Sequence, residues 1–192
     1  MCPDSRASWT NLKTVLQSYG SSKIRFYLHR FPLPYHHNSF LANQGGDVAQ
    51  SLGASPIQWM EGENFRLVLW NDGKNRLHIY IYIKCVFFFF MFSAAVYANQ
   101  EAFGNSATAN MSMNQVISQF GDLAQKSLSV SKDNFVAGLN NRTLDLELRT
   151  AWKYACSRGI TGTPIFLLNG VTAPAESTWS VQQWKTLLNQ YL

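Results

Sequence analysis

The chain has 192 residues, of which 46% are hydrophobic and 14% are charged. This composition indicates one domain with a real core and room for an insertion. The net charge of +5 comes from scattered basic residues, and no run of Lys and Arg alternates with aromatic residues, so we expect no nucleic-acid partner. Three cysteines, Cys2, Cys85 and Cys156, are too few and too unevenly spaced for a disulfide framework or a zinc site. We therefore expect no metal and no cofactor.

The first predicted element is a helix over Arg6 to Tyr19, directly after Cys2-Pro3-Asp4-Ser5. Apolar residues recur in it at three- and four-residue spacing, and Gly20 is a natural stop. A helix N-terminus stabilises a thiolate, because its N–H groups are unpaired and its dipole end is positive. Cys2 is therefore a candidate nucleophile. The alternative is a cysteine that follows the first methionine without any chemical role.

A strand is predicted next, over Lys23 to His29, because these residues alternate and are rich in β-formers. It ends at Phe31-Pro32-Leu33-Pro34-Tyr35-His36-His37, where two prolines remove hydrogen-bond donors. His29, His36 and His37 form a cluster in sequence, but without a matching carboxylate or thiol spacing they indicate packing or exposed residues rather than a metal site. Phe40 to Trp59 predicts a helical region broken near Gly45-Gly46 and Gly53.

The stretch Gly62 to Ser93 fits no local pattern, and three interpretations remain open. Leu77 to Ala98 has the length of a membrane-spanning helix, although Lys84 lies within it. Ile79 to Ile83 and Val86 to Phe92 could instead form a buried strand pair. The third interpretation is a translated intron over 62–93, since its residues are those that T-rich sequence encodes. Removing it would join Trp59-Met60-Glu61 to Ala94 in one helical run.

The second half of the chain predicts further helices and one hairpin. The helical candidates are Ala94 to Phe103, Asn114 to Ser127, Asp133 to Leu139 and Leu144 to Cys156. Thr163-Pro164 opens the hairpin, because a proline before an apolar run fits the first residue of a strand. Asn169-Gly170 supplies the tight turn between Ile165 to Leu168 and Val171-Thr172. A capping box at Ser180 begins the last helix, whose apolar face contains Trp184, Leu187, Leu188 and Tyr191.

Three separated blocks, in order, resemble one family. They are Cys2-Pro3-Asp4-Ser5, the Phe-Pro-Leu-Pro-Tyr-His run at 31–36, and Cys156-Ser157-Arg158-Gly159 before Gly162-Thr163-Pro164. The sequence resembles the DsbA-like branch of thioredoxin-fold proteins, in particular a eukaryotic and plant-type subgroup with Cys-Pro-Asp-Ser. The resemblance implies an α/β, thioredoxin-like fold with a helical insertion, in which Pro164 follows a cis bond.

The resemblance also implies a division of the chain. Residues 1–44 and 144–192 are expected to form the two parts of the thioredoxin-like domain, and 45–143 the helical insertion. In this family a strand leads into the active-site helix, and here only Met1 precedes Cys2. We therefore expect the first strand to be missing and the chain to be truncated at its N-terminus. Full-length relatives follow the secretory route or are extracellular, but no signal peptide precedes Cys2 here.

The function implied by the resemblance is thiol–disulfide exchange with one thiol. The family pattern has a second cysteine where this chain has Ser5, and a dithiol enzyme needs that thiol to resolve the mixed disulfide. Cys2 and Ser5 are therefore the expected catalytic pair, and Thr163 and Pro164 the peptide-binding loop. Protein thiols or glutathione are the expected partners, with membrane association only if 77–98 spans a membrane. The alternatives are a redox-inactive module that binds extended peptides or partner proteins, and a non-functional splice product.

Two triplets match the acceptor pattern for N-linked glycans. They are Asn110-Met111-Ser112 and Asn141-Arg142-Thr143. Such triplets matter only in a secreted protein and arise often by chance, so by themselves they say little about this chain.

Overall fold

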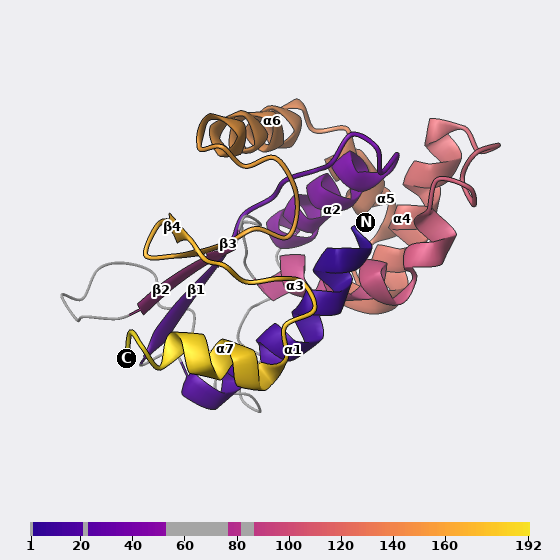
Figure 1. Ribbon diagram of the computed structural model, residues 1–192. Coiled ribbons are helices and arrows are strands. Elements are labelled where there is room, and N and C mark those ends of the chain that lie inside the picture. The colour runs from indigo at the N-terminus through magenta and orange to yellow at the C-terminus, as the bar shows by residue number, and fades with distance from the viewer. Residues whose placement is uncertain (1, 21–22, 53–76, 82–86) are drawn as a thin grey trace. The chain divides into compact units, whose positions relative to one another are not determined.

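The computed structural model describes residues 2–20, 23–52, 77–81 and 87–192, and these form two compact units (Figure 1). One, which we call the helical unit, comprises Met1–Cys2, Arg30–Pro56 and Cys85–Thr161. The other, the sheet unit, comprises Pro3–His29, Ile57–Lys84 and Gly162–Leu192.

The helical unit contains five α-helices and one 3-10 helix within the described residues. They are α2 (Ser39–Ser51), α3 (Phe87–Ala98), η1 (Gln100–Phe103), α4 (Met113–Leu128), α5 (Lys132–Leu139) and α6 (Arg142–Ser157). Side chains at the start of three of them accept backbone N–H bonds: Ser112 caps α4, Ser131 caps α5 and Asn141 caps α6. Such caps satisfy amides that the helix itself cannot pair. The helices predicted over Asn114 to Ser127, Asp133 to Leu139 and Leu144 to Cys156 are confirmed, with ends that shift by one or two residues. The helix predicted over Ala94 to Phe103 is instead the end of α3, which begins at Phe87, followed by η1.

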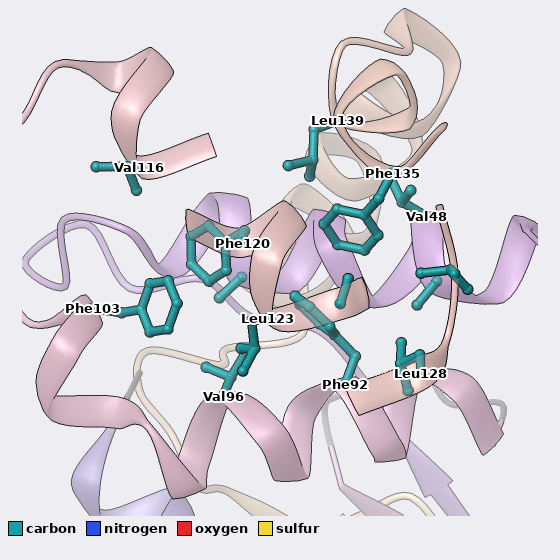
Figure 2. Packing of buried hydrophobic residues seen from close by; sticks show 14 residues of the cluster. Val48, Phe92, Val96, Phe103, Val116, Phe120, Leu123, Leu128, Phe135 and Leu139 are labelled. Atoms are coloured by element: carbon teal, nitrogen blue, oxygen red, sulfur yellow. The ribbon is translucent and has the colours of Figure 1, made fainter. Parts of the chain in front are cut away.

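Phe92 of α3 is at the centre of the apolar core of this unit (Figure 2). Its side chain is fully buried, and its ring centroid lies 5.1 Å from that of Phe135 and 6.1 Å from that of Phe120. The Phe120 ring in turn stacks on Phe103 at 4.3 Å. Aromatic pairs at these distances stabilise a core beyond the area that they bury.

The predicted break at Gly45-Gly46 is wrong, because α2 runs through both glycines without interruption. A Cβ atom built on Gly45 would lie 2.6 Å from Cε1 of Phe92. The missing side chain therefore makes room for the Phe92 ring, and the packing outweighs the cost of about 1 kcal/mol that a glycine adds to a helix. The rest of that predicted helix, from Gly53 to Trp59, lies outside the described residues.

Buried polar groups tie the loops of the helical unit to its helices. The Asn38 side-chain amide donates to the Phe103 carbonyl at 3.0 Å and to the Thr108 hydroxyl at 2.9 Å. Arg30, at 3% exposure, forms an ion pair with Asp47. Burial lowers the pKa of Arg30, while the negative charge of Glu147 opposes that shift. A charge in this position is tolerated because it is paired.

The sheet unit consists of helix α1 (Pro3–Tyr19), strands β1 (Ile24–Leu28), β2 (Leu77–Ile81), β3 (Phe166–Leu168) and β4 (Val171–Thr172), and helix α7 (Val181–Leu188). The sheet of the described residues has the strand order β1-β2-β3-β4. β1 and β2 are parallel, and the other pairs are antiparallel. Ile79 is opposite Phe26 on one side and Leu168 on the other. The predicted strand at 23–29, the hairpin and the last helix are confirmed.

Two secondary-structure elements begin inside residues 62–93, the stretch for which three interpretations were open. Leu77–Ile81 is the strand between β1 and β3, and it overlaps the strand predicted over Ile79 to Ile83. Phe87–Ala98 is a helix, so the predicted second strand over Val86 to Phe92 is wrong. No helix within the described ranges combines the length and the apolar character that a membrane crossing requires. Residues 62–76 and 82–86 lie outside the described part.

The helices of the sheet unit are joined by side-chain hydrogen bonds. The Asn11 amide of α1 donates to the Trp179 carbonyl at 3.1 Å, and the Tyr19 hydroxyl donates to Oδ1 of Asn189 at 2.6 Å. The fully buried Trp184 of α7 contacts Phe166 of β3 edge to face, with ring centroids 4.9 Å apart. α7 therefore contributes its apolar face to the core of this unit.

Candidate functional site

The four residues predicted to form the site are divided between the two units. Cys2 is part of the helical unit, whereas Ser5, Thr163 and Pro164 are part of the sheet unit.

Cys2 directly precedes α1, which begins at Pro3, three residues before the predicted start at Arg6. Pro3 occupies the first helical position, where its missing N–H costs nothing. Asp4 lies in the first turn, where a negative charge is favourable. In general, the unpaired amides and the positive dipole end of a helix start favour the thiolate form of a cysteine. The Cys2 side chain is 8% exposed and is not in a disulfide, so a reagent must reach a buried sulfur.

Ser5 lies in the first turn of the same helix and is also buried, at 7% exposure. Its carbonyl accepts a hydrogen bond from the Ser8 hydroxyl at 3.1 Å. A serine hydroxyl can donate or accept a hydrogen bond, but it cannot form a disulfide. The start of α1 thus carries one thiol.

Thr163 and Pro164 lie in the segment that enters β3, and the peptide bond between them is cis. Residues 161–165 are partly or fully exposed, whereas Phe166 and the rest of β3 are buried. The hairpin that follows turns at Asn169 and Gly170, with φ values of 48° and 85°. The Ala173 amide donates to the Phe166 carbonyl at 2.8 Å, which closes the hairpin onto β3. The loop is therefore accessible and is attached to a fixed strand.

Cys156 lies near the end of α6, and its side chain is exposed. A cysteine in a helix is often a small buried core residue, but the exposure of Cys156 excludes that role here. The buried positions of α6 are Leu148 and Ala155. Gly159, at a φ of 78°, follows the helix and allows the chain to turn toward the loop.

The histidines that cluster in the sequence are not assembled as ligands. His36 packs its ring edge to face against Tyr35, with centroids 4.8 Å apart. The His37 backbone amide donates to Oδ1 of Asn105 at 2.9 Å. Among the described residues, no three His, Cys, Asp or Glu side chains are grouped in a way that could hold a metal ion.

The Arg30–Asp47 pair is the buried charged feature that the sequence analysis missed. Both residues stand alone among neutral neighbours in the sequence, and no spacing rule joins positions so far apart. The sequence offered no local signal for the pair. Only a general rule applied, namely that a buried Arg is tolerated better when it is paired than when it is alone.

Comparison with known proteins gives one informative result. No model of a protein family matches the chain, and no curated protein matches its sequence. Among solved structures, a protein from Pseudomonas syringae whose proposed role is protein-disulfide isomerase is similar, with a TM-score of 0.64 and 17% sequence identity. The alignment covers 97% of this chain and 87% of that one.

At this identity the likeness concerns the fold. The mixed sheet, the helix that starts after Cys2, and the helices between β1 and β3 are the parts that such a fold contains. The chain has a DsbA-like thioredoxin fold with a helical insertion.

Proposed function

We propose that this protein carries out thiol–disulfide exchange with a single thiol, that of Cys2. The observation that supports this most is the position of Cys2 directly before α1 in a fold shared with a proposed protein-disulfide isomerase. At this position the helix amides and dipole favour the thiolate, the form of cysteine that attacks a disulfide.

The proposed reaction has two exchange steps. The Cys2 thiolate attacks one sulfur of a substrate disulfide, so a Cys2–substrate disulfide forms and the second substrate sulfur leaves as a thiolate. Because Ser5 has no thiol, an external thiol such as glutathione or a protein cysteine then attacks the substrate sulfur of this mixed disulfide. A new disulfide forms between that thiol and the substrate, and Cys2 returns as a thiolate. Each step exchanges one S–S bond for another.

Ser5 and the loop have supporting roles in this proposal. The Ser5 hydroxyl would be a hydrogen-bonding neighbour of the Cys2 sulfur, in place of a resolving thiol. Thr163 and Pro164 would contact an extended peptide, the role that the family resemblance implies for them. Their partial exposure is compatible with that role.

A specific observation also favours a second candidate, a redox-inactive binding module. The Cys2 and Ser5 side chains are buried, whereas the loop at 161–165 is accessible. A protein that only binds peptides would need the loop and would not need the thiol.

Incubation with oxidised glutathione distinguishes the two candidates. The exchange proposal predicts a glutathione adduct on Cys2, located by peptide mass spectrometry and released by excess reduced glutathione. Cys156→Ser should keep the Cys2 adduct, and Cys2→Ser should lose it. A Ser5→Cys variant should instead resolve the adduct internally, leaving a disulfide between positions 2 and 5.

The outcome that contradicts exchange is an adduct on Cys156 without one on Cys2, because Cys156 is exposed and Cys2 is buried. If the protein then still binds an unfolded polypeptide, and Cys2→Ser binds it equally well, the binding module is the better description. Backbone NMR shifts confined to residues 161–165 on peptide addition would locate that binding at the loop.

A further inference from the structure

We propose that Asn110 and Asn141 accept N-linked glycans when this chain enters the secretory route. The 192 residues contain two Asn-x-Ser/Thr triplets without proline at x, and these are the two. The structure adds what the triplets alone lack, namely where each acceptor and each hydroxyl lies. This proposal does not rest on thiol chemistry.

Asn110 is exposed at the end of a turn over 105–110, three residues before α4 begins. Within the described part of the chain, its side chain makes no hydrogen bond that a glycan would have to break. Its hydroxyl partner, Ser112, is exposed as well. Ser112 is the N-cap of α4, where its hydroxyl accepts from the Gln115 amide and its own amide donates to the Gln115 side chain. The acceptor is thus on the surface beside a rigid helix start.

Asn141 is exposed and is itself the N-cap of α6. Its Oδ1 accepts a hydrogen bond from the Thr143 amide at 2.8 Å. A glycan is attached to the other atom of the side-chain amide, Nδ2. Glycosylation therefore leaves Oδ1 in place, so the cap and the glycan are compatible.

The buried amides of this unit show what an unsuitable acceptor looks like. Asn38 is 5% exposed, and its Nδ2 donates to both Phe103 and Thr108. Gln44 is 3% exposed, and its Nε2 donates to the Leu139 carbonyl. A bulky, hydrated sugar requires a surface position, and both triplets have one.

The group transfer requires a lipid-pyrophosphate-linked oligosaccharide and its transferase as co-reactants. A bond forms between Nδ2 and the anomeric carbon of the sugar, and the bond from that carbon to the pyrophosphate oxygen breaks. The lipid pyrophosphate leaves with the bonding electron pair, and the amide loses one proton.

Both acceptors are in the helical unit, at the starts of α4 and α6. The ranges of the sheet unit contain no such triplet. Glycans would therefore be restricted to one unit, separate in sequence from the loop at Thr163 and Pro164.

The test directs the full chain to the lumen with an added cleavable signal sequence in cultured eukaryotic cells. Endoglycosidase digestion of the product should remove two glycans, seen as two steps in gel mobility. Asn110→Gln should remove one step and keep the Ser112 cap. Asn141→Asp should remove the other, because aspartate is an equally good cap. The double variant should show none.

Three further variants guard against substitutions that prevent folding. Thr143→Ala removes the second triplet while Asn141 stays as the cap, so it should behave as Asn141→Asp does. Ser112→Thr and Thr143→Ser keep both triplets and should keep both glycans. A product that has lost its signal sequence but shows no mobility change on digestion overturns the proposal. A single step overturns the assignment for the asparagine that is unoccupied, and a step that persists in the double variant places the sugar elsewhere.

Discussion

The two units of this protein differ in the contacts that stabilise each of them internally. In the helical unit, adjacent helices bury one continuous apolar cluster around Phe92, Phe120 and Phe135, and side-chain caps begin several of the helices. In the sheet unit, β2 joins β1 and β3, three strands that are far apart in the sequence. Local contacts form at low entropic cost, whereas distant strands must close long loops before they pair. The sheet unit therefore depends on one distant segment, Leu77–Ile81.

Deletion of residues 62–93 should have the largest effect, and it should affect the two units differently. It removes β2, so β1 and β3 lose their shared partner. It also joins Glu61 to Ala94, which brings Met60 to the helix position of Phe92, an apolar residue for an apolar residue. We expect hydrogen–deuterium exchange to show lost protection in Ile24–Leu28 and Phe166–Leu168, with α4 and α5 still protected.

The same deletion gives the shorter chain that the translated-intron hypothesis predicts. Unchanged protection in both strands would show that Leu77–Ile81 is not what joins them, and would favour that hypothesis. Lost protection in α4 and α5 would show instead that Met60 cannot take the place of Phe92.

Phe92→Ala should have the next largest effect, in the helical unit. Removing a fully buried phenylalanine leaves a cavity and should lower the free energy of unfolding by about 3 to 5 kcal/mol. Phe92→Met is the matched control and should cost less than about 1.5 kcal/mol, because it nearly conserves volume. Urea unfolding, followed by exchange in α4 and α5, measures both. Equal costs for the two variants would contradict the central place of Phe92.

Trp184→Phe tests the core of the sheet unit and should cost roughly 1 kcal/mol or less. The substitution reduces packing against Phe166, but it also removes a buried indole N–H that has no hydrogen-bond acceptor among the described residues. The relief of an unpaired donor offsets part of the lost packing. A loss above about 3 kcal/mol in urea unfolding would contradict this offset between lost packing and the removed donor.

The smallest effect should come from the exposed pair on α6. Hydrogen bonds from Arg149, at 2.7 and 3.0 Å, lower the pKa of Asp145 from its ordinary value of 3.8. Because the folded-state pKa is depressed, the stabilisation is present above the unfolded value and is lost as the pH falls through the folded one. Asp145→Asn should therefore lower the urea midpoint slightly near pH 7, and this effect should shrink as the pH falls toward 2. A larger effect at the acidic end would contradict this assignment.

Local signals predicted much of the fold. Asn169-Gly170 gave the hairpin because both residues tolerate the positive φ that its turn requires. The capping box formed by Ser180 and Gln183 correctly predicted the start of the last helix. The loop at Thr163 and Pro164 was located by a proline before an apolar strand.

The errors came from tertiary contacts. Gly45 was expected to break a helix, but it accommodates Phe92, which is distant in sequence. The stretch from Leu77 to Phe92 contains one strand and the start of one helix, and its uniformly apolar composition does not distinguish them. Nor could the sequence show that Cys2 is buried while Cys156 is exposed.

The central claim is that Cys2, and not the more accessible Cys156, is the reactive thiol. The direct test is brief iodoacetamide treatment of the native chain at about pH 6, where an ordinary thiol is almost entirely protonated, followed by peptide mapping of Cys2 and Cys156 in the same sample. We predict that Cys2 is alkylated first despite its burial, because it directly precedes α1 and a helix start is a position that activates a thiol. Alkylation of Cys156 first, with Cys2 modified only after unfolding, would contradict the claim and favour the binding module.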